Sequence, residues 1–573
     1  MSLRQTRLFL TLPLLASAAL AADETASKQA VFDSFPPAST LRAAAGHKTN
    51  AAEWVHNAVF YQIYPQSYRD TNGDGIGDLR GIMEKLDYIK SLGVDAIWLN
   101  PFYDSPFNDA GYDVRDYYKV APRYGTNEDA KELFQQAAEK GLRVIVDLVI
   151  GYTSIDHPWF IASCSPEPNK YSNWYIWTDD TWFPGQENYT AGFVQGYCER
   201  NGNFLQNFFW NEPALNYGYG ELDPEQKWQL PVDHPDILAL HEEVKHIMRF
   251  WLDLGADGFR CDMGGSLVKH DRPGRTSQVW GDFLGMMKRE YPDAFSVAEW
   301  DNAERASAAG FTANFIHWNK EYYDLWFRDE DSYFLSAGRG DITRWLGMYL
   351  RERQGSLGRD YITLTVGNHD LPRIRRWGRD RTDLELIQVF AFTMPNVPFV
   401  YYGDEIGMRQ LPIRGGKEGS YGTRAGDRTP MQWNDGVNLG FSTGSPASLY
   451  FPVDDAPDAP TVAAEENDPD SMLNFMRRLI ALKKSHPALL AYADFFPVYA
   501  QPHAYPYVFL RANAGETILV AINPANREST ATIKGTPGGK PALLMGTKLD
   551  WQQTIDATTV TVPARSFAIY TVE

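Results

Sequence analysis

The sequence is poor in cysteine, in net positive charge and in long apolar runs. Three cysteines occur in 573 residues, too few for a scaffold held by disulfide bonds. A formal net charge of −19 argues against a nucleic-acid partner, because binding phosphate requires a basic face. No stretch reaches the roughly 18–20 apolar residues that would span a bilayer. These shortages leave a globular protein without a membrane span, whose partner is expected to be a small molecule.

The N-terminal residues predict an export signal. Arg4 and Arg7 precede an apolar run over residues 8–20, and Ala19-Leu20-Ala21 offers small residues for cleavage. We therefore expect residues 1–21 to be removed and the mature protein to be exported, into a periplasm or the medium.

The three cysteines differ in their surroundings. Cys164 and Cys198 lie in one loop-rich segment and could pair in an oxidising compartment, whereas Cys261 lies in an apolar stretch. Pairing requires a close approach in space that the sequence does not reveal, so this disulfide is left open.

From Val59 onward, short apolar strands alternate with helix-length amphipathic segments, the pattern of βα units. Strands are predicted at 60–64, 96–100, 143–149, 258–263, 294–299, 313–318, 361–366 and 399–402. Helices are predicted at 79–92, 128–140, 237–254 and 472–484. Eight such strands predict an α/β fold, a (β/α)8 TIM barrel formed by residues 57–150 and 237–490.

The regular alternation is interrupted once and then ends. Residues 151–236 are rich in Trp, Tyr, Asn, Gly and Pro, and a structureless loop of that length is uncommon in a compact domain. They are predicted to form an inserted subdomain after strand three. Residues 491–573 show only short strands, at 507–511, 517–522, 542–544 and 566–570, and predict a C-terminal β-sandwich. Residues 22–56 are expected to be a poorly ordered lead-in.

Charged residues gather at the ends of the predicted strands. Arg260 and Asp262 are two positions apart on a strand and share a face, so Arg260 can keep Asp262 ionised. Strand ends of a barrel meet on one face, where catalytic residues lie. Paired carboxylates across a cleft are what glycoside cleavage requires, one as nucleophile and one as proton donor. The strand-end residues are Asp147, Arg260, Asp262, Glu299, His369, Asp370, Asp404 and Glu405.

Three segments resemble signature regions of the α-amylase family, glycoside hydrolase family 13. They are Gly258-Phe259-Arg260-Cys261-Asp262, Ala298-Glu299-Trp300 and Gly367-Asn368-His369-Asp370, and they stand in the family's order within a resemblance that covers 57–573. The resemblance implies Asp262 as nucleophile, Glu299 as general acid/base and Asp370 as a third carboxylate that binds ring hydroxyls. It also implies sugar binding by Arg260 and His369, and double displacement through a covalent glucosyl–enzyme intermediate.

Finer motifs resemble the branch that contains oligo-1,6-glucosidase, α-glucosidase, sucrose isomerase and trehalose synthase. Asp109-Ala110-Gly111-Tyr112 is similar to the segment in which an Asp grips the terminal glucose and a Tyr stacks beneath it. Arg428-Thr429-Pro430-Met431-Gln432-Trp433 resembles the segment whose Arg pairs with that Asp. We therefore expect an Asp109–Arg428 bridge to close the pocket's end, which favours exo action on short α-glucosides.

The segment 70–78 looks like the metal loop of the same branch. Its alternating oxygen donors suit a hard cation such as Ca²⁺. The segment begins like an EF-hand, but Gly81 stands where the twelfth-position Glu should be, and that interpretation is rejected. A simple Asn-Gly turn is the alternative. The implied ligands are Asp70, Asn72, Asp74, the Ile76 carbonyl and Asp78.

The sequence departs from its family beside the nucleophile. Where the family has Asn-His after strand three, this chain has Gly151 and Tyr152. Tyr152 offers a hydroxyl and a stacking face but cannot carry a positive charge, so it is either a tolerated replacement or a change in substrate. The segment 212–216 matches the inserted subdomain's motif loosely, and Met263 is not the small or branched residue that helps sort linkages. The linkage is therefore left open.

The leading hypothesis is a hydrolase that releases glucose from the non-reducing end of small α-glucosides or oligosaccharides. A transglycosidase or isomerase on the same scaffold, of sucrose isomerase or trehalose synthase type, is the first alternative. A non-catalytic carbohydrate-binding relative is the second, and the presence of all three carboxylates argues against it. The oligomeric state is left open.

Overall fold

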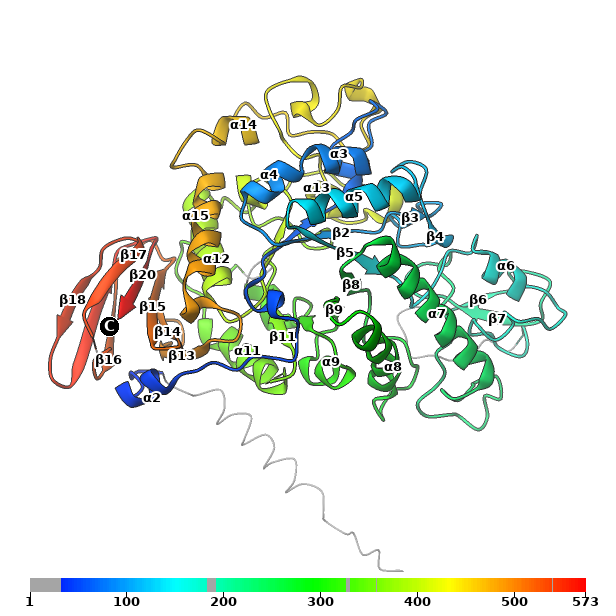
Figure 1. Ribbon diagram of the computed structural model, residues 1–573, viewed down its shortest axis with the longest axis horizontal. Coiled ribbons are helices and arrows are strands. Elements are labelled where there is room, and N and C mark those ends of the chain that lie inside the picture. Colours follow the sequence, from blue (N-terminus) through cyan, green and yellow to red (C-terminus); the bar gives the residue numbers. More distant parts are fainter. Residues whose placement is uncertain (1–31, 183–191, 326–329, 357, 538, 573) are drawn as a thin grey trace, which may run out of the picture.

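A closed parallel barrel occupies the middle of the molecule (Figure 1). The computed structural model describes residues 32–182, 192–325, 330–356, 358–537 and 539–572. The strands follow the order β11-β10-β9-β8-β5-β2-β1-β12, and a parallel bridge between Thr365 and Phe399 joins the two ends. The strands are β1 (Phe60–Ile63), β2 (Ala96–Leu99), β5 (Arg143–Leu148), β8 (Gly258–Cys261), β9 (Phe295–Glu299), β10 (Ala313–Phe315), β11 (Tyr361–Thr363) and β12 (Phe399–Tyr401). The predicted TIM barrel is confirmed.

Helices follow the strands and pack around the outside of the barrel (Figure 1). Capping residues in the sequence explain where two of these helices begin and end. A capping box between Thr126 and Asp129 begins α5, and α7 begins with Pro235 and ends at Gly255, where φ is 120°. The helices are α3 (Leu79–Glu84), α4 (Leu86–Ser91), α5 (Asn127–Glu139), α7 (Pro235–Leu254), α8 (Arg275–Glu290), α9 (Ala303–Ala309), α10 (Lys320–Tyr323), α11 (Ile342–Ser356), α12 (Arg381–Thr393) and α15 (Met472–Ser485).

The single helix predicted at 79–92 is wrong in one respect, because two short helices stand there. Lys85 leaves the helical region, with φ −107° and ψ 5°, and separates α3 from α4. Ile82 of α3 and Ile89 of α4 are both buried, so the two short helices keep the apolar face that the helical period predicted.

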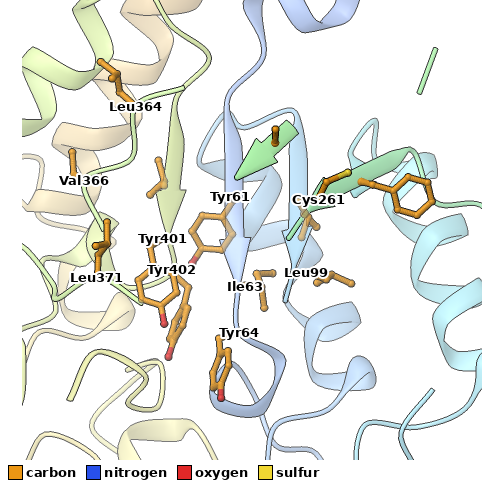
Figure 2. Packing of buried hydrophobic residues seen from close by; sticks show 14 of the residues in the cluster. Tyr61, Ile63, Tyr64, Leu99, Cys261, Leu364, Val366, Leu371, Tyr401 and Tyr402 are labelled. Carbon is orange, nitrogen blue, oxygen red and sulfur yellow. The ribbon is translucent and has the colours of Figure 1, made fainter. Parts of the chain in front are cut away.

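The period of two along each strand separates two cores. Side chains such as Tyr61, Ile63 and Leu99 point outward and pack beneath the helices (Figure 2). Their neighbours in sequence point inward: the rings of Phe60 and Phe399 stack inside the barrel with centroids 4.4 Å apart. The apolar inner core fills the amino-terminal half of the barrel, with Phe60, Trp98, Ile145, Phe295, Phe315 and Phe399 among its members. The next inward-facing position on each strand therefore lies beyond this apolar core, toward the carboxyl ends of the strands.

Two further regions extend from the barrel. Between β5 and α7 the chain forms α6 (Pro158–Ser163), β6 (Phe193–Gln195) and β7 (Asn203–Leu205), at the edge of the molecule opposite the C-terminus (Figure 1). The hairpin of β3 (Tyr103–Asp104) and β4 (Asp116–Val120) precedes α5. The C-terminal region has one five-stranded and one three-stranded antiparallel sheet. Its strands are β13 (Asp494–Tyr499), β14 (Tyr507–Asn513), β15 (Glu516–Asn523), β16 (Ser529–Lys534), β17 (Pro541–Gly546), β18 (Asp550–Gln553), β19 (Ala557–Val562) and β20 (Ser566–Val572).

The expectation of a poorly ordered lead-in is wrong from residue 32 onward. The short helix α2 (Ala38–Ala43) lies against the C-terminal sheets, and Phe35 and Leu41 join their apolar core. Backbone hydrogen bonds from Phe35 to Lys534 and from Lys534 to Asp33 fix the segment. The export signal predicted at 1–21 lies outside the described residues. Within those residues, no helix combines the length and apolar character needed to cross a bilayer.

Candidate active site

Beyond the apolar inner core of the barrel, the inward-facing side chains become polar at the carboxyl ends of the strands. Asp147 of β5 lies opposite Arg260 of β8, and Arg260 lies opposite Val297, two residues before Glu299. Gly258 permits this close approach of β8 to β9: its φ is +143°, and a Cβ there would lie 2.0 Å from the Phe295 carbonyl oxygen. Strand register therefore brings the predicted residues of three strands together.

The buried Arg260 guanidinium contacts three carboxylates at once. Its Nη1 lies 2.6 Å from Asp147 Oδ1 and 2.7 Å from Asp262 Oδ1, and its Nη2 lies 2.6 Å from Glu299 Oε2. Asp147 also accepts a hydrogen bond from Trp98 Nε1 at 2.9 Å. One cation cannot neutralise three anions, so the cluster favours holding a proton.

Burial and the guanidinium act on these carboxyls in opposite directions. Burial raises the pKa of Asp147 to about 6 and the pKa of Asp262 well above its ordinary value, and Arg260 only partly offsets it. Burial also acts to raise the pKa of Glu299, but Arg260, His317 and Trp318 together outweigh it and hold that pKa well below its ordinary value. Without substrate, the Asp147–Asp262 side of the cluster is thus the side that favours the proton.

Glu299 has further partners that the sequence did not reveal. Trp318 Nε1 donates to Glu299 Oε1 at 2.9 Å, and the Met263 backbone N–H donates to Oε2 at 3.2 Å. Met263 has φ +47°, a strained conformation for a residue with a side chain, which directs this N–H toward Glu299. Trp318 was predicted as the last residue of a strand, but β10 ends at Phe315 and Trp318 lies beyond it. Its aromatic character alone carried no signal of this contact.

Asp370 lies between two arginines. Arg428 Nη2 and Arg424 Nε lie 3.0 and 3.2 Å from Asp370 Oδ1, and His369 Nε2 lies 3.5 Å from Oδ2. Burial acts to raise the pKa of Asp370, but Arg424 and its neighbours outweigh it and hold the pKa below its ordinary value. Asp370 is therefore ionised at neutral pH, as a carboxylate that accepts sugar hydroxyls must be.

The predicted Asp109–Arg428 bridge is wrong in this structure. Arg428 pairs with Asp370, and its Nε donates to the His369 carbonyl oxygen at 2.7 Å. The motif located Arg428 near the pocket, but the guanidinium of Arg428 lies against the Asp370 carboxylate rather than against Asp109. Among the described residues Asp109 makes no ion pair.

Asp109 instead shares a hydrogen bond with the Glu212 side chain. Glu212 is fully buried, and its Oε2 accepts the backbone N–H groups of Phe208 and Phe209, each at 3.3 Å. Burial and the nearby Asp109 carboxylate raise the pKa of Glu212 well above its ordinary value. Glu212 is therefore the protonated partner, and it connects Asp109 to the inserted subdomain.

Tyr112 and His369, two of the residues that the motifs singled out, lie against each other at one side of the site. Their rings stack with centroids 5.4 Å apart, and Tyr112 Oη lies 2.6 Å from His369 Nε2. Asn100 Nδ2 donates to the same hydroxyl at 3.0 Å. Burial lowers the pKa of His369 to about 3, so the imidazole is neutral and available as a hydrogen-bonding group.

Tyr152 contacts the predicted nucleophile directly. Its hydroxyl donates to Asp262 Oδ2 at 3.2 Å, and its backbone forms a bridge with Ala214 of the inserted subdomain. Gly151 has open space beside it, with nothing within 4 Å of where a Cβ would be. The departure from the family pattern therefore lies directly beside the predicted nucleophile.

These residues surround a cavity of about 340 Å³, the size of a pocket for a small ligand. The predicted Asp109, Tyr112, Tyr152, Asp262, Glu299 and Asp370 all line it. Its remaining wall includes Met263, which the sequence had singled out as the residue after the predicted nucleophile. The other wall residues were not predicted and are Phe208, Phe209, Trp318, Tyr421 and Arg424. The rings of Phe209 and Tyr421 meet edge to face at 5.9 Å, so the inserted subdomain contacts the segment after β12 beside the pocket. Arg260, His369 and Arg428 lie just behind the wall.

The segment 70–78 folds as a tight loop with its carboxylates turned toward its own backbone. Asp70 accepts N–H groups of Asn72, Gly73 and Gly75 at 2.7–3.0 Å, and Asp78 accepts Thr71 and Gly81 N–H groups. Its donors are all oxygens, which fits a hard cation in type. In the part of the chain that the structure describes, no three His, Cys, Asp or Glu side chains converge as a metal cluster.

Comparison with known proteins gives a consistent result. The model of the α-amylase catalytic domain matches residues 62–492. The oligo-1,6-glucosidase of Heyndrickxia coagulans is 31% identical over 536 residues, which cover 82% of this chain and 92% of the relative. The trehalose synthase/amylase of Mycobacterium tuberculosis is 32% identical and covers 82% of each chain.

A solved structure of the trehalulose synthase MutB in complex with Tris has 27% sequence identity and a TM-score of 0.75. It covers 91% of this chain and 100% of its own. Another structure of a MutB mutant holds the substrate sucrose. The similar proteins therefore include a glucosidase, a trehalose synthase/amylase and a trehalulose synthase.

Proposed function

The chain belongs to the α-amylase family, and from that premise we propose that it is a retaining, exo-acting α-glucosidase of short α-glucosides. The membership itself makes the chain a glycosidase or transglycosidase. The finer proposal is carried by one observation: Asp262 and Glu299 contact neighbouring nitrogens of the single Arg260 guanidinium at the wall of a sugar-sized pocket. This arrangement keeps the two carboxyls close, and retaining enzymes need about 5 Å between them, less than inverting enzymes do.

In the first step Asp262 attacks the anomeric carbon while Glu299 protonates the departing glycosidic oxygen. Before substrate binds, the contacts with Arg260 and Trp318 hold Glu299 ionised. The glycosidic oxygen must therefore compete with these two side chains for contact with the Glu299 carboxyl. The proton favoured by the Asp147–Asp262 side must then pass to Glu299. The guanidinium that contacts all three carboxyls stabilises the charge as this exchange occurs.

In the second step Glu299 removes a proton from the acceptor, and the acceptor oxygen displaces Asp262 from the anomeric carbon. Asp370 binds the ring hydroxyls of the same glucosyl unit, because it is ionised and faces the pocket. Tyr112, whose ring packs on His369, supplies the stacking face beside it. Asp109, held by Glu212, binds the far side of the glucose and limits the pocket to a chain end.

A panel of α-linked disaccharides tests this function. The protein is incubated with each sugar, products are identified by chromatography, and the first-formed glucose anomer is followed by proton NMR. We expect glucose to be released initially as the α-anomer. Release of the β-anomer would contradict double displacement, and cleavage of polymer without activity on disaccharides would contradict exo action.

A transglycosidase or isomerase is the second candidate, and the aromatic part of the wall favours it. Phe208, Trp318 and Tyr421 are each more than 40% exposed although all three line the pocket. Such rings can hold an acceptor sugar by stacking and keep water from the glucosyl–enzyme intermediate. In the disaccharide panel, this candidate predicts isomeric disaccharides rather than free glucose.

We also propose that the loop 70–78 binds Ca²⁺, on the basis of its oxygen donors and three carboxylates within nine residues. Asp70, Asn72, Asp74, Asp78 and the Ile76 carbonyl would hold the ion and fix the loop. Chelator should lower the melting temperature and added Ca²⁺ should restore it, because the ion binds only the native state. Calorimetry with metal-stripped protein measures this, and elemental analysis must confirm removal; an unchanged melting temperature after removal would refute the site.

Export by the signal in residues 1–21 is proposed on the sequence alone. Expression of the full chain in a secreting host should yield a protein whose first residues follow Ala21, as read by N-terminal sequencing. An intact Met1 on the protein would contradict it.

A further inference from the structure

Two cysteines that are 34 positions apart meet in the inserted subdomain. Cys164 caps the carboxyl end of α6, and Cys198 follows β6. Both thiols are free in the structure, and their side chains are joined by a hydrogen bond. We propose that Cys164 and Cys198 form a reversible disulfide that fastens the inserted subdomain.

The surrounding contacts hold the two segments in place on both sides of the pair. The rings of Phe160 and Tyr197, one on each segment, lie 5.8 Å apart. Arg200 Nη1 donates to the carbonyl oxygens of Ser163 and Ser172, at 3.0 and 2.7 Å. The two cysteines therefore meet through fixed neighbours rather than by a chance approach of two loops.

The two sulfurs differ in their readiness to react. The hydrogen bond from Cys164, supported by the Arg200 guanidinium, lowers the pKa of Cys198 to about 7. The same hydrogen bond and burial raise the pKa of the Cys164 thiol. Burial opposes this effect on Cys198, and Glu199 opposes it more weakly. Cys198 is accordingly the more readily ionised thiol of the pair. Both cysteines are partly exposed to a reagent, whereas Cys261 is fully buried.

A small-molecule disulfide such as oxidised glutathione supplies the oxidant. The Cys198 thiolate attacks one glutathione sulfur, forms a mixed disulfide and releases glutathione thiolate. Cys164 then loses its proton to the released thiolate and attacks Cys198 sulfur, and a second glutathione leaves. Two protein thiols are oxidised and one glutathione disulfide is reduced to two thiols. The cross-link ties α6 to the segment beyond β6 and restricts the unfolded chain between them.

The test counts thiols in the full-length protein. Reduced protein is incubated with oxidised glutathione, quenched with acid, denatured, alkylated and weighed by mass spectrometry. Of the three cysteines, we expect only Cys261 to be alkylated, and a proteolytic peptide should contain Cys164 joined to Cys198. Three alkylated cysteines after prolonged oxidation would overturn the proposal. So would glutathione remaining on both cysteines, or a cross-link that involves Cys261 or a second chain.

Matched serine variants separate the two sulfurs. In Cys164→Ser, Cys198 should gain one glutathione quickly and stop there; in Cys198→Ser, Cys164 should react more slowly. Oxidation should raise the melting temperature of the unaltered protein by a few degrees and leave both variants unchanged. Equal rates in the two variants would contradict Cys198 as the attacking thiolate. An equal rise in melting temperature in either variant would show that the cross-link is not its cause.

Discussion

The two halves of the pocket are built differently. The half around Asp262 and Glu299 is formed by inward positions of β5, β8 and β9 and is buried. The half around Phe208 and Tyr421 comes from the inserted subdomain and the segment after β12, and its rings are partly exposed. The register of the barrel strands fixes the first half, and its three carboxylates share the guanidinium of Arg260. The second is formed by loops, so the residues proposed for the chemistry and those proposed for sugar preference lie on separate parts of the chain.

The largest effect should come from neutralising the carboxylates of the buried half. Asp262→Asn and Glu299→Gln should each lower kcat by about four orders of magnitude, because each acts in the transition state. Neither should lower the melting temperature, since three carboxylates share one guanidinium and losing one relieves repulsion. Steady-state kinetics and calorimetry measure both effects. Near-normal turnover in either variant would refute the assigned role.

The next effect concerns Tyr152, which belongs to the insertion but contacts the buried half. Gly151→Asn with Tyr152→His should shift the ratio of kcat/KM between disaccharides about tenfold toward ordinary α-glucosides, because open space beside Gly151 can accept the amide. Tyr152→Phe is the matched control, as it removes only the hydroxyl that reaches Asp262. If all three proteins give the same profile across the disaccharide panel, Tyr152 does not shape substrate choice.

Trp318 joins the two halves, and its ring and its N–H can be tested separately. Trp318→Phe removes the hydrogen bond to Glu299 and should cost about tenfold in kcat/KM. Because this hydrogen bond lowers the pKa of Glu299, its loss should move the alkaline limb of the pH profile upward. Trp318→Leu also removes the ring and should in addition raise KM. Indistinguishable Phe and Leu variants would show that the ring contributes nothing to binding.

The smallest effect should come from Glu212→Gln, which keeps the hydrogen bond to Asp109 without a titrating proton. In the native protein the pKa of Glu212 is raised. Its protonated form therefore contributes stability at low pH, and this contribution falls as pH rises from the unfolded value through the folded one. The variant should match the unaltered protein in acid and melt a few degrees higher in alkali. Parallel melting curves at every pH would contradict the shared proton.

How far the sequence predicts the structure depends on the range of the interactions involved. The eight barrel strands were predicted because period and apolar content are local, and the strand-end residues Asp262 and Glu299 followed from their positions. The helix predicted at 79–92 is split at Lys85, a break for which the local pattern gave no signal. The segment that includes Phe35 is ordered because it packs against the distant C-terminal strands. Four C-terminal strands were missed, β13, β16, β18 and β19, whose alternating or short patterns are weak locally.

The site shows the same limit in the partners of its side chains. Motifs located Asp109 and Arg428, but not that Arg428 would pair with Asp370 while Asp109 turned to Glu212. The choice between carboxylates a few ångströms apart depends on side-chain reach and competing hydrogen bonds. No linear pattern records these.

The sequence by itself determined the barrel, the family to which the chain belongs and the positions of the carboxylates that are proposed to be catalytic. These follow from strand periodicity and from short motifs whose residues are close in the chain. Only the tertiary structure decided that one guanidinium serves Asp147, Asp262 and Glu299, that Trp318 reaches Glu299, and that Cys164 meets Cys198. Each of those contacts joins segments brought together by packing, and its geometry is set by the distances between elements rather than by the order of residues along the chain.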